Sequence, residues 1–165
     1  MKKILLMVLF IAPVSLFAQK FGHFNSAELI QLMPDYKTAQ TELENLQKQY
    51  EDEIKNMQDE FNRKYEDYTK QQDSLPANIR QRREQELQEL QQRIQQTAAE
   101  DQQNLQKQSS DKMQAIADKV RSAVKEIGDA GGYVYIMDTT SGIPYISESQ
   151  SKDLTAEIKA KLGLK

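Results

Sequence analysis

The sequence of 165 residues lacks cysteine and tryptophan, and it contains one histidine, four prolines and six glycines. Without cysteine the chain can form neither a disulfide framework nor a thiolate metal site. A single histidine, His23, cannot build the histidine clusters of zinc sites, and no Gly-x-Ser-x-Gly elbow of a serine nucleophile occurs. We therefore expect no catalytic centre, no metal site and no cofactor, and a protein that is not an enzyme.

Apolar residues are also scarce, at 38% of the chain. Globular domains carry about 45–50%, so this chain has too few for a core that uses its whole length. Glutamine is abundant instead, with 18 of the 21 glutamines between Asp35 and Ile127. Proline and glycine are scarce over the same stretch, which favours long, solvated helices over disorder or a compact enzyme fold.

Residues 1–18 have the pattern of an export signal. Lys2 and Lys3 precede an apolar run from Ile4 to Phe17, and Ala18 offers a cleavage point before Gln19. The alternative is an uncleaved anchor, but the run is shorter than the roughly 20 residues that span a bilayer. We expect cleavage and no stable membrane insertion. The remaining chain has 20 basic and 25 acidic residues, which argues against nucleic-acid binding.

Residues 36–127 carry a regular apolar pattern. Its spacing of three, four and four residues is an eleven-residue repeat, typical of a nearly straight helical seam. The pattern breaks at residues 74–78, around Pro76, which predicts a turn between two antiparallel helices. The first helix shows the repeat most clearly, at Leu43, Leu46, Tyr50, Ile54, Met57, Phe61, Tyr65 and Tyr68.

Folding the chain at this turn pairs residues whose numbers sum to roughly 151. Large side chains then face small ones, as when Ile54 meets Ala98. At about 1.5 Å per residue the hairpin is a rod of roughly 57 Å, longer than a globular domain of this size is wide. Three polar seam residues, Asp101, Ser109 and Lys112, predict a local bend or splay of the rod.

The stretches 19–35 and 128–165 flank the rod. Phe21 to Asn25 is a short strand pattern, and Ser26 is a candidate cap for the helical turn that follows. Tyr133 to Met137 is a concentrated run of strand-forming residues, and we read 143–146 as the strand that returns beside it. Ser151 or Asp153 then caps a final helix whose apolar face is Leu154, Ile158 and Leu162.

These two ends are too small to bury sufficient surface alone, because sheets of this size are marginally stable. Strands beginning at Phe21 and Tyr133 would leave edges open to pairing with another chain. We therefore expect subunits to associate through a β-rich body formed by 19–35 and 128–165.

The aromatic residues of the rod allow two interpretations. Tyr50, Phe61, Tyr65 and Tyr68 pack in the hairpin seam, or part of this stripe contacts unfolded client chains. Both can hold, because an aromatic side chain can pack on one side and bind on the other.

The order of these features resembles the Skp/OmpH family of periplasmic outer-membrane-protein chaperones. The resemblance runs from about Lys20 to Leu162 and rests on the export signal, the Phe21–Asn25 strand, the Pro34 break and the charged hairpin. It also rests on two later stretches, Tyr133-Val134-Tyr135-Ile136-Met137-Asp138 and Ser151-Lys152-Asp153-Leu154-Thr155-Ala156-Glu157-Ile158.

The resemblance implies a mostly α, α+β fold: a homotrimer with a small β-rich trimerisation body and projecting coiled-coil tentacles. By position it assigns Phe21, Phe24, Val134 and Ile136 to that body. It also implies an ATP-independent periplasmic holdase that encloses unfolded outer membrane proteins. The alternative is a structural coiled-coil adaptor or spacer of the cell envelope.

One feature departs from the family pattern. The best-known members are strongly basic, which helps them attract acidic clients and lipopolysaccharide. Residues 35–127 here carry 15 basic and 19 acidic residues, which argues against lipopolysaccharide binding.

Overall fold

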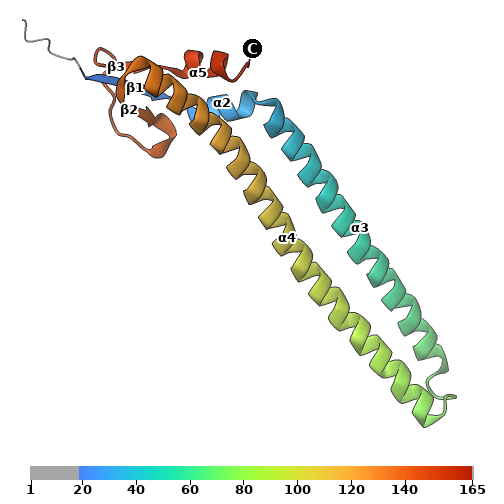
Figure 1. Ribbon diagram of the computed structural model, residues 1–165. Coiled ribbons are helices and arrows are strands. Elements are labelled where there is room, and N and C mark those ends of the chain that lie inside the picture. Colours follow the sequence, from blue (N-terminus) through green and yellow to red (C-terminus); the bar gives the residue numbers. More distant parts are fainter. Residues whose placement is uncertain (1–18, 165) are drawn as a thin grey trace, which may run out of the picture.

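A computed structural model describes residues 19–164 and shows a long helical hairpin projecting from a small sheet (Figure 1). The hairpin consists of α3 (Pro34–Gln71) and α4 (Ala77–Gly131), which contain 38 and 55 residues. At 1.5 Å per residue these helices are about 57 and 83 Å long. The predicted fold class, mostly helical with a small sheet built from both chain ends, is confirmed.

Side-chain contacts between α3 and α4 define the register of the hairpin. The paired residue numbers sum to 152–154, within three residues of the value near 151 that the seam predicted. Two of these contacts are ion pairs and two are hydrogen bonds: Asp35 with Lys119, Glu42 with Lys112, Tyr50 with Asn104, and Tyr68 with Glu84.

The helix ends follow from local chemistry. Pro34 occupies the first turn of α3, where its missing N–H costs no hydrogen bond. α4 continues to Gly131, four residues beyond the end at Ile127 that the seam predicted. Gly132 ends it in a left-handed conformation with φ of 65°, and its N–H donates to the carbonyl of Gly128.

The sheet has three strands, β1 (Lys20–Phe24), β2 (Tyr133–Asp138) and β3 (Ser151–Asp153), in the order β2-β1-β3. Both pairings are parallel. Two predictions were therefore wrong: the strand containing Phe21 is central rather than at an edge, and residues 143–146 form a loop rather than a returning strand.

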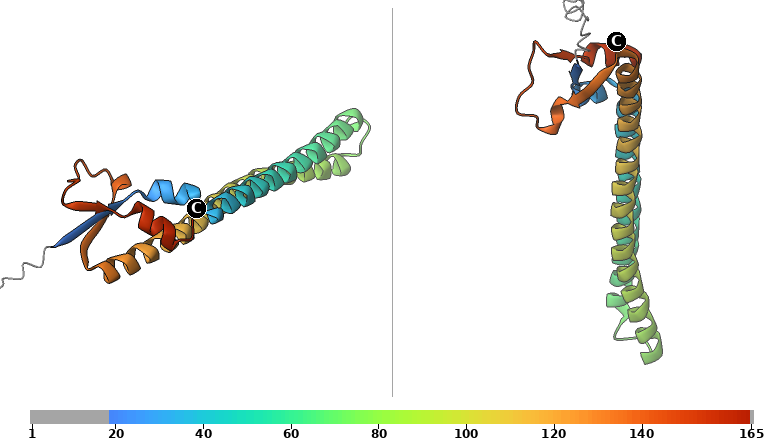
Figure 2. Two further views of the ribbon diagram at one scale, coloured as in Figure 1. Left: turned by 90° about the horizontal axis from the view of Figure 1, so that it is seen from above. Right: turned by 60° about the vertical axis from the view of Figure 1, so that its left-hand side comes forward.

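The chain after β2 makes a short 3-10 turn, η1 (Thr139–Ser141), instead of a hairpin. The Asp138 carboxylate accepts hydrogen bonds from the backbone N–H groups of Thr140 and Ser26, at 3.1 and 3.2 Å, and so holds this turn against the start of α2. The following loop crosses back to the starting end of the sheet, as a parallel pairing of β3 requires. Figure 2 shows this loop extending to one side of the rod.

Two short helices, α2 (Ser26–Leu32) and α5 (Thr155–Lys161), complete the body. Asn25 caps α2 by accepting from the N–H of Glu28 at 3.1 Å, so the predicted Ser26 cap was one residue off. At α5, Asp153 accepts from the N–H of Thr155 at 2.9 Å, whereas the alternative candidate Ser151 lies in β3.

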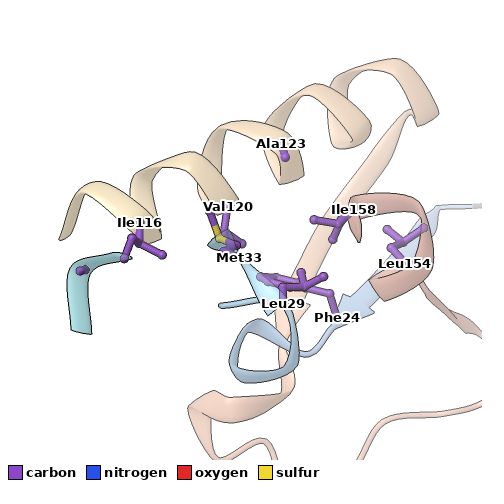
Figure 3. Close-up of a cluster of buried hydrophobic side chains, with 9 residues drawn as sticks. Phe24, Leu29, Met33, Ile116, Val120, Ala123, Leu154 and Ile158 are labelled. Carbon is purple, nitrogen blue, oxygen red and sulfur yellow. The ribbon is translucent and has the colours of Figure 1, made fainter. Parts of the chain in front are cut away.

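One buried cluster joins the body to the base of the rod (Figure 3). Leu29, Leu154 and Ile158 are fully buried in it, and the last two belong to the apolar face predicted for the final helix. The same cluster includes side chains of α4, so residues from both chain ends are joined to the base of the rod. The cluster contains Phe24, Leu29, Met33, Ala39, Ile116, Val120, Ala123, Leu154 and Ile158.

Gly22 on the central strand allows this packing. A Cβ atom at residue 22 would lie 2.5 Å from Cδ1 of Leu154, which is itself fully buried and has no room to move. Glycine thus permits the chain before α5 to cross closely over β1.

We predict that Ile158→Ala lowers the free energy of unfolding by about 2–4 kcal/mol, because truncation leaves a cavity in a fully buried site. The control is Leu32→Ala, since Leu32 is 40% exposed and its truncation should cost less than about 1 kcal/mol. Urea unfolding followed by circular dichroism, at one protein concentration, measures both. Equal costs would contradict the assignment of the core.

A second prediction concerns acid. Burial raises the pKa of Asp138, but the hydrogen bonds from Ser26 and Thr140 outweigh it and lower the pKa. The hydrogen bond to Thr155 lowers the pKa of Asp153. A lowered pKa stabilises the fold above the unfolded-state value of about 3.9, and this contribution is lost as pH falls through the folded-state value.

We therefore expect Asp138→Asn to reduce the free energy of unfolding at pH 7 by about 1 kcal/mol. Between about pH 5 and pH 3, the free energy of unfolding of this variant should fall less than that of the unsubstituted protein. Urea titrations across this range measure both effects. Asp59→Asn, at an exposed position of α3, is the matched control and should follow the unsubstituted protein. The same pH profile for both variants would disprove the role of Asp138.

Candidate functional site

The described residues present exposed surfaces that are candidate interaction sites. Between residues 19 and 164 no group of three or more histidine, aspartate or glutamate side chains is placed to hold a metal ion. No helix in this range is both long and apolar enough to cross a membrane. Exposed large apolar side chains occur on the sheet and along the rod, and these areas are the candidate sites.

One exposed area, which we call the body surface, consists of Phe21, Tyr135, Met137 and Tyr145. The rings of Phe21 and Tyr135 stack with centroids 6.3 Å apart and planes within 8°. Tyr135 is 59% exposed and Tyr145 is 79% exposed, although both are large aromatic side chains. Exposed aromatics grouped in this way are typical of a protein interaction surface.

A cavity of about 180 Å³ lies at the body surface, under the loop that follows η1. His23 contributes to its lining, and its Nδ1 lies 2.9 Å from the Ser151 hydroxyl oxygen. His23 is thus partly buried and joined to β3 by this contact.

The four residues predicted for the oligomerisation body lie in different environments. Phe21 belongs to the body surface, and Val134 is 46% exposed on β2. Phe24 is buried in the protomer's own core, and Ile136 packs against that core. Tyr135 and Met137 were missed, although alternation along a strand places both on one face of β2.

On the rod, Phe61 and Tyr65 form what we call the aromatic pair. Their rings lie one helical turn apart on α3, with centroids 6.1 Å apart and planes within 10°. Phe61 is half-buried against the hairpin, whereas Tyr65 is 52% exposed. The pair therefore presents an aromatic area to solvent on an otherwise polar rod.

The other two tyrosines of the stripe fasten α3 to α4. The Tyr50 hydroxyl oxygen accepts a hydrogen bond from Nδ2 of Asn104 at 2.8 Å. The Tyr68 hydroxyl donates to the Glu84 carboxylate near the tip of the hairpin, and this hydrogen bond raises the pKa of Tyr68. Both side chains are half-buried, so the structure separates them from the more exposed Tyr65.

Between the helices, near the middle of the rod, is an open cleft of about 410 Å³, which we call the mid-rod cleft. Tyr50 and Ile54 of α3 and Ala98, Asp101 and Leu105 of α4 line it. Of the three polar seam residues only Asp101 lines the cleft, and the bend or splay expected at these residues stays a prediction. The sequence placed Asp101 in the seam but gave no sign that a cleft would form beside it.

The model of the family described as Outer membrane protein (OmpH-like) matches residues 20–162. A solved structure from Caulobacter crescentus CB15, described as a candidate outer membrane chaperone (OmpH-like), has the same fold, with a TM-score of 0.72. The two chains are 12% identical, and the match covers 87% of this chain and 83% of the other. A comparison with curated proteins gave no match.

Proposed function

This chain belongs to the OmpH-like family, and we propose that it is an ATP-independent holdase chaperone of the periplasm. It would enclose unfolded outer membrane proteins between its helical rods and prevent their aggregation. The observation that carries the proposal is the aromatic pair, an exposed apolar site on a solvated rod that stands away from the protein's own core.

The composition of the rod supports binding that is weak and tolerant of sequence. An unfolded client exposes apolar side chains, and burying one against Tyr65 contributes a fraction of the roughly 1.5–3 kcal/mol of full burial. Several such contacts hold a client without fixing its conformation. The glutamine and charged residues of the remaining rod surface would keep the loaded complex in solution.

Enclosing a client needs more than one rod. We propose that the body joins three chains into a homotrimer and so brings three rods together. The body surface exposes aromatic side chains, and the outer edges of β2 and β3 have no strand beside them among residues 19–164. Unpaired strand edges favour addition of strands from another chain. Three rods fixed to one body would surround a common cavity.

The proposed location follows from the expected export signal, which lies outside the described residues, and from membership of the family. Client release would follow from folding of the client in the outer membrane. No nucleotide is required for such a step, because the folded client no longer offers the apolar segments that the rods bind.

The first test is suppression of aggregation. The purified chain without residues 1–18, at several-fold excess, should suppress light scattering by a urea-diluted outer-membrane β-barrel protein. Tyr65→Gln should raise the concentration needed by about two- to fivefold, because it removes the exposed ring. Tyr65→Phe keeps the ring and should retain full activity.

Absence of suppression by the unsubstituted protein would overturn the holdase proposal. Tight binding of one folded partner, with no binding of unfolded chains, would instead support the structural adaptor or spacer. Circular dichroism of each variant ensures that the rod is intact in the comparison.

The second test is mass in solution. Light scattering coupled to size-exclusion chromatography should give three times the subunit mass. Tyr135→Ser should shift this equilibrium toward monomer at low micromolar concentration, because Tyr135 is exposed in the protomer and would be buried between subunits. Tyr65→Gln is the control, since it removes an exposed aromatic ring from the rod and should leave the mass unchanged. A monomeric unsubstituted protein would refute the trimer.

A further inference from the structure

The mid-rod cleft combines an apolar lining with one unsatisfied acceptor. Ile54, Ala98 and Leu105 supply apolar walls, and Asp101 reaches the cleft from the seam position of α4. The volume of about 410 Å³ is within the range of about 300–1,000 Å³ typical of ligand pockets. The cleft opens to solvent along the rod, so a side chain of another molecule can enter it.

Asp101 differs from the other charged residues of the hairpin interface. Its Oδ2 atom is buried and has no hydrogen-bond partner among the described residues. Lys112, also in the seam, forms an ion pair with Glu42, and Lys119 at the base of the rod forms one with Asp35. Burying a carboxylate oxygen without a hydrogen-bond partner costs free energy. A donor that binds Asp101 removes this cost, so its binding is more favourable than binding to an exposed acid.

We propose that the mid-rod cleft binds a lysine or arginine side chain of an unfolded client, with Asp101 accepting its charged head group. The aliphatic stem of either residue would lie along Ile54, Ala98 and Leu105, and such stems commonly pack on apolar surface. Charge favours this occupant, because the lining contains two acids, Asp101 and Glu51, and one lysine, Lys55. An apolar client side chain alone would leave Asp101 unsatisfied.

Arginine is expected to bind better than lysine. Its guanidinium is less strongly hydrated and presents several donors in a plane, so it loses less on entering a partly buried cleft. The cleft would thus give the rod a preference for cationic segments, in addition to the general apolar binding by the aromatic pair. This inference rests on the proposed function for the identity of the ligand, but the binding site itself can be tested separately.

Lys55 is the competing donor within the rod, since it lines the same cleft. Lys55 is exposed, and among the described residues Oδ2 of Asp101 has no hydrogen-bond partner, so Lys55 does not occupy this acceptor. If Lys55 swings toward Asp101 in the free protein, a client cation must displace it. Lys55→Gln should then strengthen binding of a cationic peptide.

The experiment compares two unstructured, fluorescently labelled peptides of ten residues, identical except that one carries arginine where the other carries citrulline. Citrulline has nearly the shape of arginine but no charge. Fluorescence anisotropy with the full oligomer should show about five- to tenfold tighter binding of the arginine peptide. Asp101→Asn should reduce this preference to twofold or less while leaving the citrulline peptide unaffected.

Two further variants distinguish binding at the mid-rod cleft from general charge attraction. Asp111→Asn makes the same change at an exposed position on α4, beside Lys107, and should keep the preference. Ala98→Leu fills the cleft while retaining Asp101 and should abolish the preference. Circular dichroism and urea unfolding establish that each variant is folded, and Asp101→Asn should be at least as stable as the unsubstituted protein because it removes a buried, unpaired charge.

Equal loss of preference in Asp101→Asn and Asp111→Asn would overturn the inference in favour of general charge attraction. A preference that survives in Asp101→Asn or in Ala98→Leu would also overturn it. If the unsubstituted protein suppresses aggregation but shows no arginine preference, the cleft proposal fails while the holdase proposal stands. If it shows the preference but suppresses no aggregation, the holdase proposal fails and the cleft remains a cation-binding site.

Discussion

The architecture depends on one buried contact between the two ends of the chain and α4. Leu29 comes from the N-terminal part and Leu154 and Ile158 from the C-terminal part, and all three are fully buried in one cluster that also contains Ile116 and Val120 of α4. An ion pair of 2.6 Å between Lys161 and Glu126 adds to this junction at its surface. Because both ends are joined to the base of the hairpin, the parts of α3 and α4 beyond this cluster project away from the body.

The division into a packed body and a projecting rod explains how a chain with few apolar residues can fold and still expose a large surface. Body residues pack in layers, whereas rod residues such as Leu46 and Met57 are half-buried along a single seam. Few side chains of a two-helix seam are buried, as Leu87 and Leu90 are, and a large aromatic such as Tyr65 stays exposed. The geometry that buries few side chains in the rod also leaves its side chains available to bind other chains.

Polar residues in the seam have different consequences according to their length and partners. Lys112 is long enough to reach Glu42 on the opposite helix and thereby joins the hairpin. Asp101 is short, and beside Ala98 it leaves a cleft and an unsatisfied oxygen. A defect in packing of this kind is tolerated in a rod, because the remaining contacts along α3 and α4 maintain the register.

The sequence by itself determined the elements that depend on local periodicity: the two long helices, the turn near Pro76, their register to within three residues, and the buried face of Leu154 and Ile158. These follow because helix period and turn chemistry are encoded by neighbouring residues. Only the tertiary structure decided the parallel order β2-β1-β3, the use of Asp138 to hold α2 rather than to turn a hairpin, and the cleft at Asp101. Each of these depends on contacts between residues that are far apart along the chain, and no local pattern records which partner a strand, a carboxylate or a seam position will meet.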